Sequence, residues 1–244
     1  MKRVIVTGAN GFIGSTLVNN LLKNGVKVVA IDISFATPRI PDCEQVVKLE
    51  TGLDDVGNLK GLIPDGEYDA MYLFAWAGVN GPSKADPTVQ LNNIQLGINC
   101  AKLCKAIGVK KLLCAGTVAE QAVHSLPNLS QTRGGMMYGV AKHCTHLMLE
   151  TYCKNIGVEY LTVYAFSTEN WRRPENEVST IMKLLGKYLQ EAIDTMERDH
   201  IRMKVLGDLE GLSPELRQMI TKTDEISQRY EGFQANICLN YGGR

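Results

Sequence analysis

The chain has 244 residues, of which 45% are hydrophobic and 21% are charged, and its 26 basic side chains balance its 26 acidic ones. This composition excludes collagen-like, low-complexity and intrinsically disordered chains, and the balanced charge argues against a nucleic-acid-binding surface. No apolar run approaches the roughly 20 residues that cross a bilayer, and the N-terminus is too short and too soon interrupted for a signal peptide. We therefore expect a cytoplasmic protein with no transmembrane segment and no nucleic-acid partner.

Short β-rich runs alternate with longer helical patterns along the chain. Several runs, such as VIV and LTVYAF, are continuously apolar, which is typical of strands covered on both faces of a parallel sheet. The alternation predicts a doubly wound, mostly parallel α/β sheet. The predicted strands cover residues 3–7, 27–31, 45–49, 70–74, 111–115, 160–166, 203–206 and 235–240, and the predicted helices cover residues 14–23, 89–106, 138–154, 177–197 and 215–229.

The first predicted strand runs into a glycine-rich loop, GANGFIG, which opens the first helix. Gly8 permits a tight turn, Gly11 lets the backbone approach a pyrophosphate, and Gly14 lets the helix pack close to the strand. The helix N-terminus supplies N–H donors and partial positive charge. Asp32 ends the next strand, where its carboxylate can accept two ribose hydroxyls and repel a 2′-phosphate. The loop predicts an NAD site, with NAD favoured over NADP; the alternative is a structural turn beside an incidental aspartate.

A second pattern, YGVAK, places Tyr138 and Lys142 four residues apart on one helix face. An ammonium group beside a phenol lowers the pKa of the phenol, so Tyr138 could serve as an acid or base near neutral pH. Thr117 follows a predicted strand at the carboxyl edge of the sheet, where its hydroxyl could bind a substrate oxygen beside Tyr138. The alternative is a solvated lysine beside a core tyrosine.

These motifs, with LFAWAG after a strand and NNIQLGIN in the next helix, resemble one family over residues 1–158. It is the extended short-chain dehydrogenase/reductase family, the NAD-dependent epimerases and dehydratases. The resemblance implies a nucleotide-sugar substrate and a catalytic set of Thr117, Tyr138 and Lys142. Residues 115–117 read Ala-Gly-Thr where many relatives carry consecutive serines, and the single hydroxyl of Thr117 suffices for the role. It implies cofactor contacts, or support for them, at Gly8, Asn10, Gly11, Phe12, Ile13, Gly14, Asp32, Ala75, Asn93 and Lys142.

The pattern changes near residue 158. The segment LTVYAFSTENWRRPENEV, the sequence VLGD and the ending NICLNYGGR resemble the cis-prenyltransferases that make undecaprenyl diphosphate, over residues 157–244. This second resemblance implies a prenyl diphosphate ligand near Asn170, Trp171 and Arg173, with Mg²⁺ as cofactor. The apolar stripe of the helix over residues 177–197 is either a core face or, by the resemblance, a wall of the prenyl-chain tunnel.

In each half, segments that are typical of the family it resembles are not found. The DGNGRW segment of the prenyltransferases does not occur, and their later diphosphate-binding and metal-binding segments would follow Arg244. Because prenyl transfer depends on placing those charges, we expect no detectable transfer. The substrate domain of the epimerases is also not found after residue 158, so we expect cofactor binding more readily than turnover.

No linker separates the halves, and residues 155–161 would suit either family. We therefore expect a hybrid chain: an NAD-binding Rossmann-like domain over residues 1–158, continued by a partial cis-prenyltransferase-like α/β segment over residues 159–244. A non-catalytic remnant is the third interpretation. Recombination, misassembled sequence data and deliberate construction are all open as its origin.

The seven cysteines form no C-x-x-C pair, and none of the four histidines has metal-finger spacing, so we expect no zinc site and name no metal ligands. Most of these cysteines lie in apolar stretches and are interpreted as small core residues of a protein in a reducing compartment. Both families commonly dimerise through helices, so a homodimer is compatible with the two resemblances.

Overall fold

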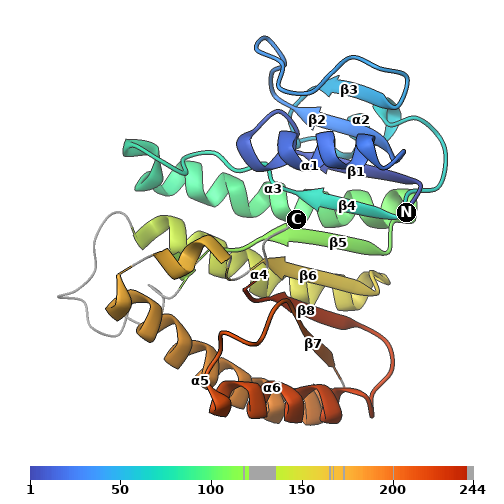
Figure 1. Cartoon of the computed structure of the whole chain (residues 1–244). Coiled ribbons are helices and arrows are strands. Elements are labelled where there is room, and N and C mark those ends of the chain that lie inside the picture. Colours follow the sequence, from blue (N-terminus) through green and yellow to red (C-terminus); the bar gives the residue numbers. More distant parts are fainter. Residues whose placement is uncertain are drawn as a thin grey trace.

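The computed structural model describes residues 1–117, 119–120, 136–164, 166, 168–172, 174–199 and 201–240. In this part of the chain, eight parallel strands form one sheet in the order β3-β2-β1-β4-β5-β6-β8-β7 (Figure 1). The sheet confirms the predicted α/β architecture, and it crosses from one half of the sequence into the other without a break. The strands are β1 (Arg3–Thr7), β2 (Lys27–Asp32), β3 (Val46–Glu50), β4 (Ala70–Leu73), β5 (Lys111–Ala115), β6 (Tyr160–Tyr164), β7 (Arg202–Leu206) and β8 (Gln234–Cys238).

All five predicted helices are present, and their ends differ from the prediction by less than a turn. A sixth helix, α2, was not predicted. The helices are α1 (Phe12–Lys23), α2 (Val56–Leu62), α3 (Pro87–Ile107), α4 (Met136–Ile156), α5 (Glu175–Asp199) and α6 (Pro214–Ser227), with 3₁₀ turns η1 (Pro82–Lys84) and η4 (Thr168–Arg172).

Local signals set the helix ends. The Asp86 carboxylate accepts the backbone N–H groups of Thr88 and Val89 at 2.8 and 3.2 Å, which satisfies two donors of the first turn of α3. Gly108 ends that helix in the left-handed region at φ 74°, where a residue with a Cβ is strained. These caps bracket the helix that packs behind the loop after β4.

The two faces of the central strands are both buried. In β1, Ile5 belongs to the core that α2, α3 and α4 cover, whereas Val4 and Val6 belong to the opposite core, where Val18 of α1 packs. All three β1 residues have no exposed surface. Helices therefore cover both faces of this part of the sheet, as the continuous apolar runs predicted.

The core continues across the junction of the two halves. Residues 111–115 of β5 pair in register with residues 160–164 of β6, and Leu112 and Leu161 lie in one hydrophobic cluster. Beyond β6, helices α5 and α6 pack over β8 and β7, with Leu189 and Leu216 buried in a further cluster. Figure 1 shows these two helices beside each other at the lower end of the sheet.

The predicted last strand, residues 235–240, is two residues too long at its C-terminal end. Strand β8 ends at Cys238, and Asn240 takes a left-handed conformation at φ 47°, which turns the chain away from the sheet. Among the described residues, no helix is both long and apolar enough to cross a membrane.

Candidate functional site

The glycine-rich loop lies between β1, β4 and the start of α1. Gly8 has a positive φ of 65°, and a Cβ there would lie 2.6 Å from the backbone nitrogen of Ala75. A Cβ at Gly14 would lie 2.0 Å from the carbonyl oxygen of Gly8. Side chains cannot be added at either position without moving the backbone, which agrees with the tight turn and close helix packing expected from the sequence.

The first turn of α1 is open toward the loop. Its N-cap residue, Gly11, makes no side-chain cap, and the first turn carries no acidic side chain. Phe12 and Ile13 are 82% and 56% exposed, which is unusual for apolar side chains at the edge of a core. Uncapped N–H groups with partial positive charge fit an anion such as a pyrophosphate.

Asp32 lies at the carboxyl end of β2 against the same loop. Its two carboxylate oxygens accept the backbone N–H groups of Asn10 and Ile33, each at 2.8 Å. The Asn10 amide in turn donates to the carbonyl oxygens of Ser34 and Thr37, and its oxygen accepts the N–H of Arg39 at 2.8 Å. The carboxylate is thus fixed in place and each oxygen keeps capacity for a further hydrogen bond, which fits two ribose hydroxyls.

Asn93 holds the segment that follows β4 in place through hydrogen bonds. It is 2% exposed, its Oδ1 accepts the N–H of Ala77 and its Nδ2 donates to the carbonyl of Ala77, both at 2.9 Å. Gln90, one turn earlier in α3, accepts from Trp76 Nε1 at 3.1 Å and donates to the carbonyl of Gly78. Asn93 is therefore a supporting position, and Gln90 and Trp76 are members of this segment that the sequence motifs did not identify.

Thr117, Tyr138 and Lys142 come together at the carboxyl end of β5. The Thr117 side chain hydrogen-bonds Tyr138, whose ring meets the Trp76 ring edge-on at 6.0 Å. Lys142 is 4% exposed, its Nζ donates to the carbonyl of Ala115 at 2.8 Å, and it lies 3.8 Å from the Trp76 ring centroid. Tyr138 and Lys142 do share one helix face, and the alternative of a solvated lysine is wrong.

The expected effect of Lys142 on Tyr138 is also wrong. Burial raises the pKa of Tyr138, and the charge of Glu120 raises it further, against the lowering effect of the hydrogen bond with Thr117. Burial lowers the pKa of Lys142, partly offset by Cys114 and Glu120. Because the ammonium group is directed at Ala115 and Trp76, desolvation governs the phenol, and Tyr138 keeps its proton near neutral pH.

Glu120 connects this group to α4, and no motif identified it. Its Oε1 accepts the backbone N–H of Thr117 at 2.7 Å, and its Oε2 contacts His146 Nδ1 at 2.6 Å. Gly139 permits the close approach of the segment before Glu120 to α4, because a Cβ at Gly139 would lie 1.9 Å from the carbonyl oxygen of Ala119. The ion pair joins residues 26 apart in sequence, which only the fold brings together.

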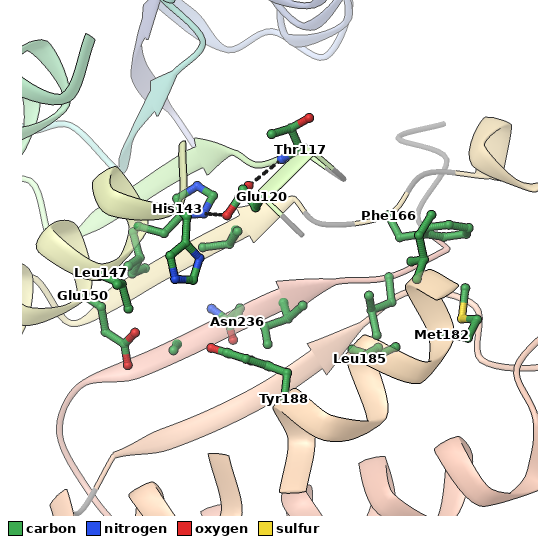
Figure 2. A pocket seen from close by; sticks show the side chains of 17 residues that line it. Thr117, Glu120, His143, Leu147, Glu150, Phe166, Met182, Leu185, Tyr188 and Asn236 are labelled. Carbon is green, nitrogen blue, oxygen red and sulfur yellow. Dashed lines mark hydrogen bonds and ion pairs between the residues drawn. The ribbon is translucent and has the colours of Figure 1, made fainter. Parts of the chain in front are cut away.

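A pocket of about 200 Å³ lies where the two halves of the chain meet. Figure 2 shows it between α4, the strands β6 and β8, and α5, with Leu185 and Tyr188 of α5 on one side and Glu120 on the other. Its walls are mainly apolar, and its polar lining comes largely from α4 and the segment after β5. The lining residues are Thr117, Glu120, His143, His146, Leu147, Glu150, Leu161, Val163, Phe166, Ile181, Met182, Leu185, Tyr188, Ala235, Asn236, Ile237 and Leu239.

The residues expected to hold a prenyl diphosphate are placed only in part. Trp171 packs edge-on against Phe166 at 5.3 Å, and its Nε1 donates to Asn240 Oδ1 at 2.6 Å. Asn240 also donates to the carbonyl of Asp208 at 2.8 Å. Asn170 lies beside Trp171 in η4, and Arg173 lies outside the described residues. Trp171 thus contributes a contact between the segments that follow β6, β7 and β8.

The second half of the chain matches a known family by sequence. Residues 130–244 match the family model described as "Putative undecaprenyl diphosphate synthase". An isoprenyl transferase of Helicobacter pylori is 44% identical over 93 residues, which are 38% of this chain and 40% of that protein. The undecaprenyl-diphosphate synthase of Pectobacterium atrosepticum is 37% identical over 94 residues, and the chain spans 37% of its length.

The fold as a whole is similar to that of epimerases. A UDP-galactose 4-epimerase superposes with a TM-score of 0.57 at 19% identity, covering 97% of this chain and 76% of that one. The Bordetella bronchiseptica enzyme WbmF, solved in complex with NAD⁺, has a TM-score of 0.55 at 26% identity, covering 68% of this chain and 50% of that one. The chain therefore resembles two families and is a hybrid, as the sequence motifs predicted.

Proposed function

We propose that the chain binds NAD at the carboxyl ends of β1, β2 and β4 and is an epimerase- or dehydratase-type oxidoreductase of the nucleotide-sugar class. The observation that supports this best is that three features lie at the same edge of the sheet. They are the uncapped N-terminus of α1, the Asp32 carboxylate and the group of Thr117, Tyr138 and Lys142. That edge is where open α/β sheets bind their ligands. The likeness to WbmF in complex with NAD⁺ supports the same cofactor.

The residues have distinct roles in this proposal. The N–H groups of the first turn of α1 bind the pyrophosphate, Gly11 leaves room for it, and Asp32 accepts the ribose hydroxyls. Bound NAD would supply a hydride acceptor. Tyr138 holds or releases the proton of a substrate hydroxyl, Thr117 orients that oxygen, and Lys142 lies deep enough to contact the nicotinamide ribose. The raised pKa of Tyr138 favours its protonated form, which can donate a proton in the reducing step, whereas the oxidising step requires Tyr138 to lose its proton first.

A calorimetric titration with NAD tests the cofactor site. Gly11→Asp puts a carboxylate at the N-terminus of α1, where it repels a pyrophosphate, and we expect affinity to fall on the order of 100-fold. Gly61→Asp is the matched control, because a Cβ at Gly61 meets nothing within 4 Å and the same charge is added in α2. Equal NAD binding by both variants, or none by the unchanged chain, would refute the proposed site.

The nucleotide preference tests Asp32 separately. Asp32→Asn removes the charge that repels a 2′-phosphate while it keeps an oxygen that can accept from Asn10. We expect NAD affinity to fall about tenfold, equivalent to about 1.4 kcal/mol, and NADP affinity to rise. An unchanged ratio of the two affinities would show that the carboxylate does not face the ribose.

A second candidate function rests on the pocket and on the family match of residues 130–244. We propose that the apolar wall formed by α5 can hold the hydrocarbon chain of a prenyl diphosphate, without prenyl transfer. Among the described residues no cluster of three metal-ligating side chains is present, so no step is assigned to Mg²⁺. Farnesyl diphosphate should quench Trp171 fluorescence in a Trp76→Phe background, and Leu185→Gln should weaken that quenching. Quenching that is absent, or unaffected by Leu185→Gln, would refute this candidate.

We also propose that the two halves divide at residue 158, that the protein is cytoplasmic and that it forms a homodimer. Light scattering on the purified full chain tests the dimer, with twice the mass of 26.9 kDa as the expected result.

A further inference from the structure

Three side chains beside the proposed NAD site form a continuous chain of contacts. Cys114 lies near the end of β5, and its Sγ is 3.7 Å from Nε2 of His146 on α4. On the other side of the ring, His146 Nδ1 contacts Glu120 Oε2 at 2.6 Å. The arrangement is a thiol, an imidazole and a carboxylate in sequence. This is the order in which a nucleophile, its proton partner and an orienting group act in covalent catalysis.

The carboxylate is itself held in position. Glu120 Oε1 accepts the N–H of Thr117 at 2.7 Å, so Oε2 is left to face the imidazole. The side chains of His146 and Glu120 are only 11% and 18% exposed. Burial alone would lower the pKa of His146, but the contacts with Cys114 and Glu120 together raise it to about 10. The imidazole therefore holds a shared proton strongly and is oriented to exchange it with sulfur.

The thiol lies behind residues that line the apolar pocket at the junction of the two halves. Cys114 pairs in register with Val163 of β6, and paired residues of neighbouring parallel strands project from the same face of the sheet. Val163, His146 and Glu120 all line the pocket. Cys114 is only 2% exposed, and His146, which lies 3.7 Å from its sulfur, separates it from the pocket, so we expect a reagent to reach the sulfur past His146.

The other buried thiols lack this arrangement. Burial raises the pKa of Cys153 to about 12, and that of Cys104 rises well above its ordinary value for the same reason. Cys43 is exposed. The chain thus contains a buried comparison, Cys153, and an accessible one, Cys43, for any reaction at Cys114.

We propose that Cys114 is an acyl-accepting nucleophile, with His146 as its proton partner and Glu120 orienting His146, and that the acyl donor is a thioester with a short apolar chain. The pocket favours such a chain, because its walls near Leu147 and Leu185 are apolar and its volume is below that of pockets for larger ligands. The inference is independent of NAD binding.

The transfer balances without a further reactant. The proton shared between Cys114 and His146 stays on Nε2 while the sulfur attacks the thioester carbonyl and forms a new carbon–sulfur bond. The bond between the carbonyl carbon and the donor sulfur then breaks. The leaving thiolate takes the proton from Nε2, so one thioester is exchanged for another and no oxidant or reductant is needed.

The experiment incubates the full chain with the butyryl thioester of N-acetylcysteamine and follows acylation at each cysteine by peptide mass spectrometry. We expect Cys114 to be acylated faster than Cys43 despite its burial. His146→Gln should slow acylation of Cys114 on the order of 100-fold and leave Cys43 unchanged. Cys153→Ala should leave the rate at Cys114 unchanged.

A second variant covers the case in which His146→Gln does not fold. Leu185→Trp fills the pocket from α5 without substituting any of the three contacting side chains, and we expect it to slow acylation of Cys114 about tenfold or more by excluding the donor. Acylation of Cys43 alone would overturn the proposal. So would a rate at Cys114 that neither His146→Gln nor Leu185→Trp lowers. The NAD titration remains a separate measurement, so the two proposals fail independently.

Discussion

The two ends of the sheet use their polar groups differently. At the N-terminal end, the segments after β1 and β2 keep hydrogen-bonding capacity directed outward: the first turn of α1 is uncapped and Asp32 accepts only backbone donors. At the C-terminal end, Trp171, Asn240 and Asp208 bond to one another. The same edge of one sheet thus keeps unused hydrogen-bonding capacity at one end and holds a set of mutual contacts at the other.

The central strand β1 and the edge strand β7 also differ in how fully their two faces are buried. Val4, Ile5 and Val6 of β1 are all fully buried. In β7 and β8, Met203 and Ile237 face the core under α5 and α6, whereas the alternate residue Lys204 is exposed. The central strand β1 is therefore buried on both faces, whereas the edge strand β7 is buried mainly on one. We conclude that close packing constrains β1 more strongly than β7.

The largest expected difference comes from one substitution in each half. Gly14→Ala would place a Cβ 2.0 Å from the Gly8 carbonyl oxygen, so the backbone must move, and we expect a loss of about 3 kcal/mol in unfolding free energy. Gly186→Ala would meet Leu216 Cδ2 at 3.4 Å, an ordinary contact, and should stabilise α5 by about 0.5–1 kcal/mol. Thermal melts of both variants measure the difference; similar melting temperatures would contradict it.

The contact of His146 with Glu120 has a pH signature. Because the pKa of His146 is raised to about 10, its stabilising contribution is fully present below pH 6.5 and is lost as pH rises through 10. His146→Gln should therefore cost about 2 kcal/mol at pH 6 and progressively less toward pH 10. Urea unfolding of both proteins from pH 6 to 10 measures this difference. A difference that stays constant with pH would show that the imidazole is uncharged.

The smallest effect compares the two tryptophans. Trp171→Phe and Trp76→Phe each remove one indole N–H donor to an amide oxygen, of Asn240 and Gln90 respectively, and each should cost about 1 kcal/mol. Their effects on ligand binding should differ, because Trp76 also contacts Tyr138 and Lys142. We expect only Trp76→Phe to weaken NAD binding. Equal NAD affinities would place Trp76 outside the cofactor site.

Much of this fold could be predicted because its strands are locally encoded. The apolar runs of β1 and β5 and the glycines of the first loop are contiguous in sequence, and the structure places them as predicted. Helix α2 was missed because it is one short element, VGNLKGL, with two glycines; the Asp55 cap, which accepts from Asn58 at 3.0 Å, was its available signal.

The side chains around Tyr138 show where sequence reasoning stops. The spacing of Tyr138 and Lys142 predicts their shared face, but burial and the neighbours of each group determine its pKa. The contacts of Glu120 and His146 join positions that no periodic pattern relates. Desolvation and long-range pairing are properties of the folded chain, so the direction of the Tyr138 shift could not be read from five adjacent residues.

The in-register pairing of β5 with β6 has a consequence for how such chains can be assembled. A parallel ladder is made by backbone groups, so it accepts any neighbour with the right strand length and a suitable apolar face. The pairing of β5 with β6 is thus a place where α/β units can be exchanged by recombination. Exchanging β6 and the part after it for β-α-β units from other folds would make new pocket walls while the glycine-rich loop stays intact.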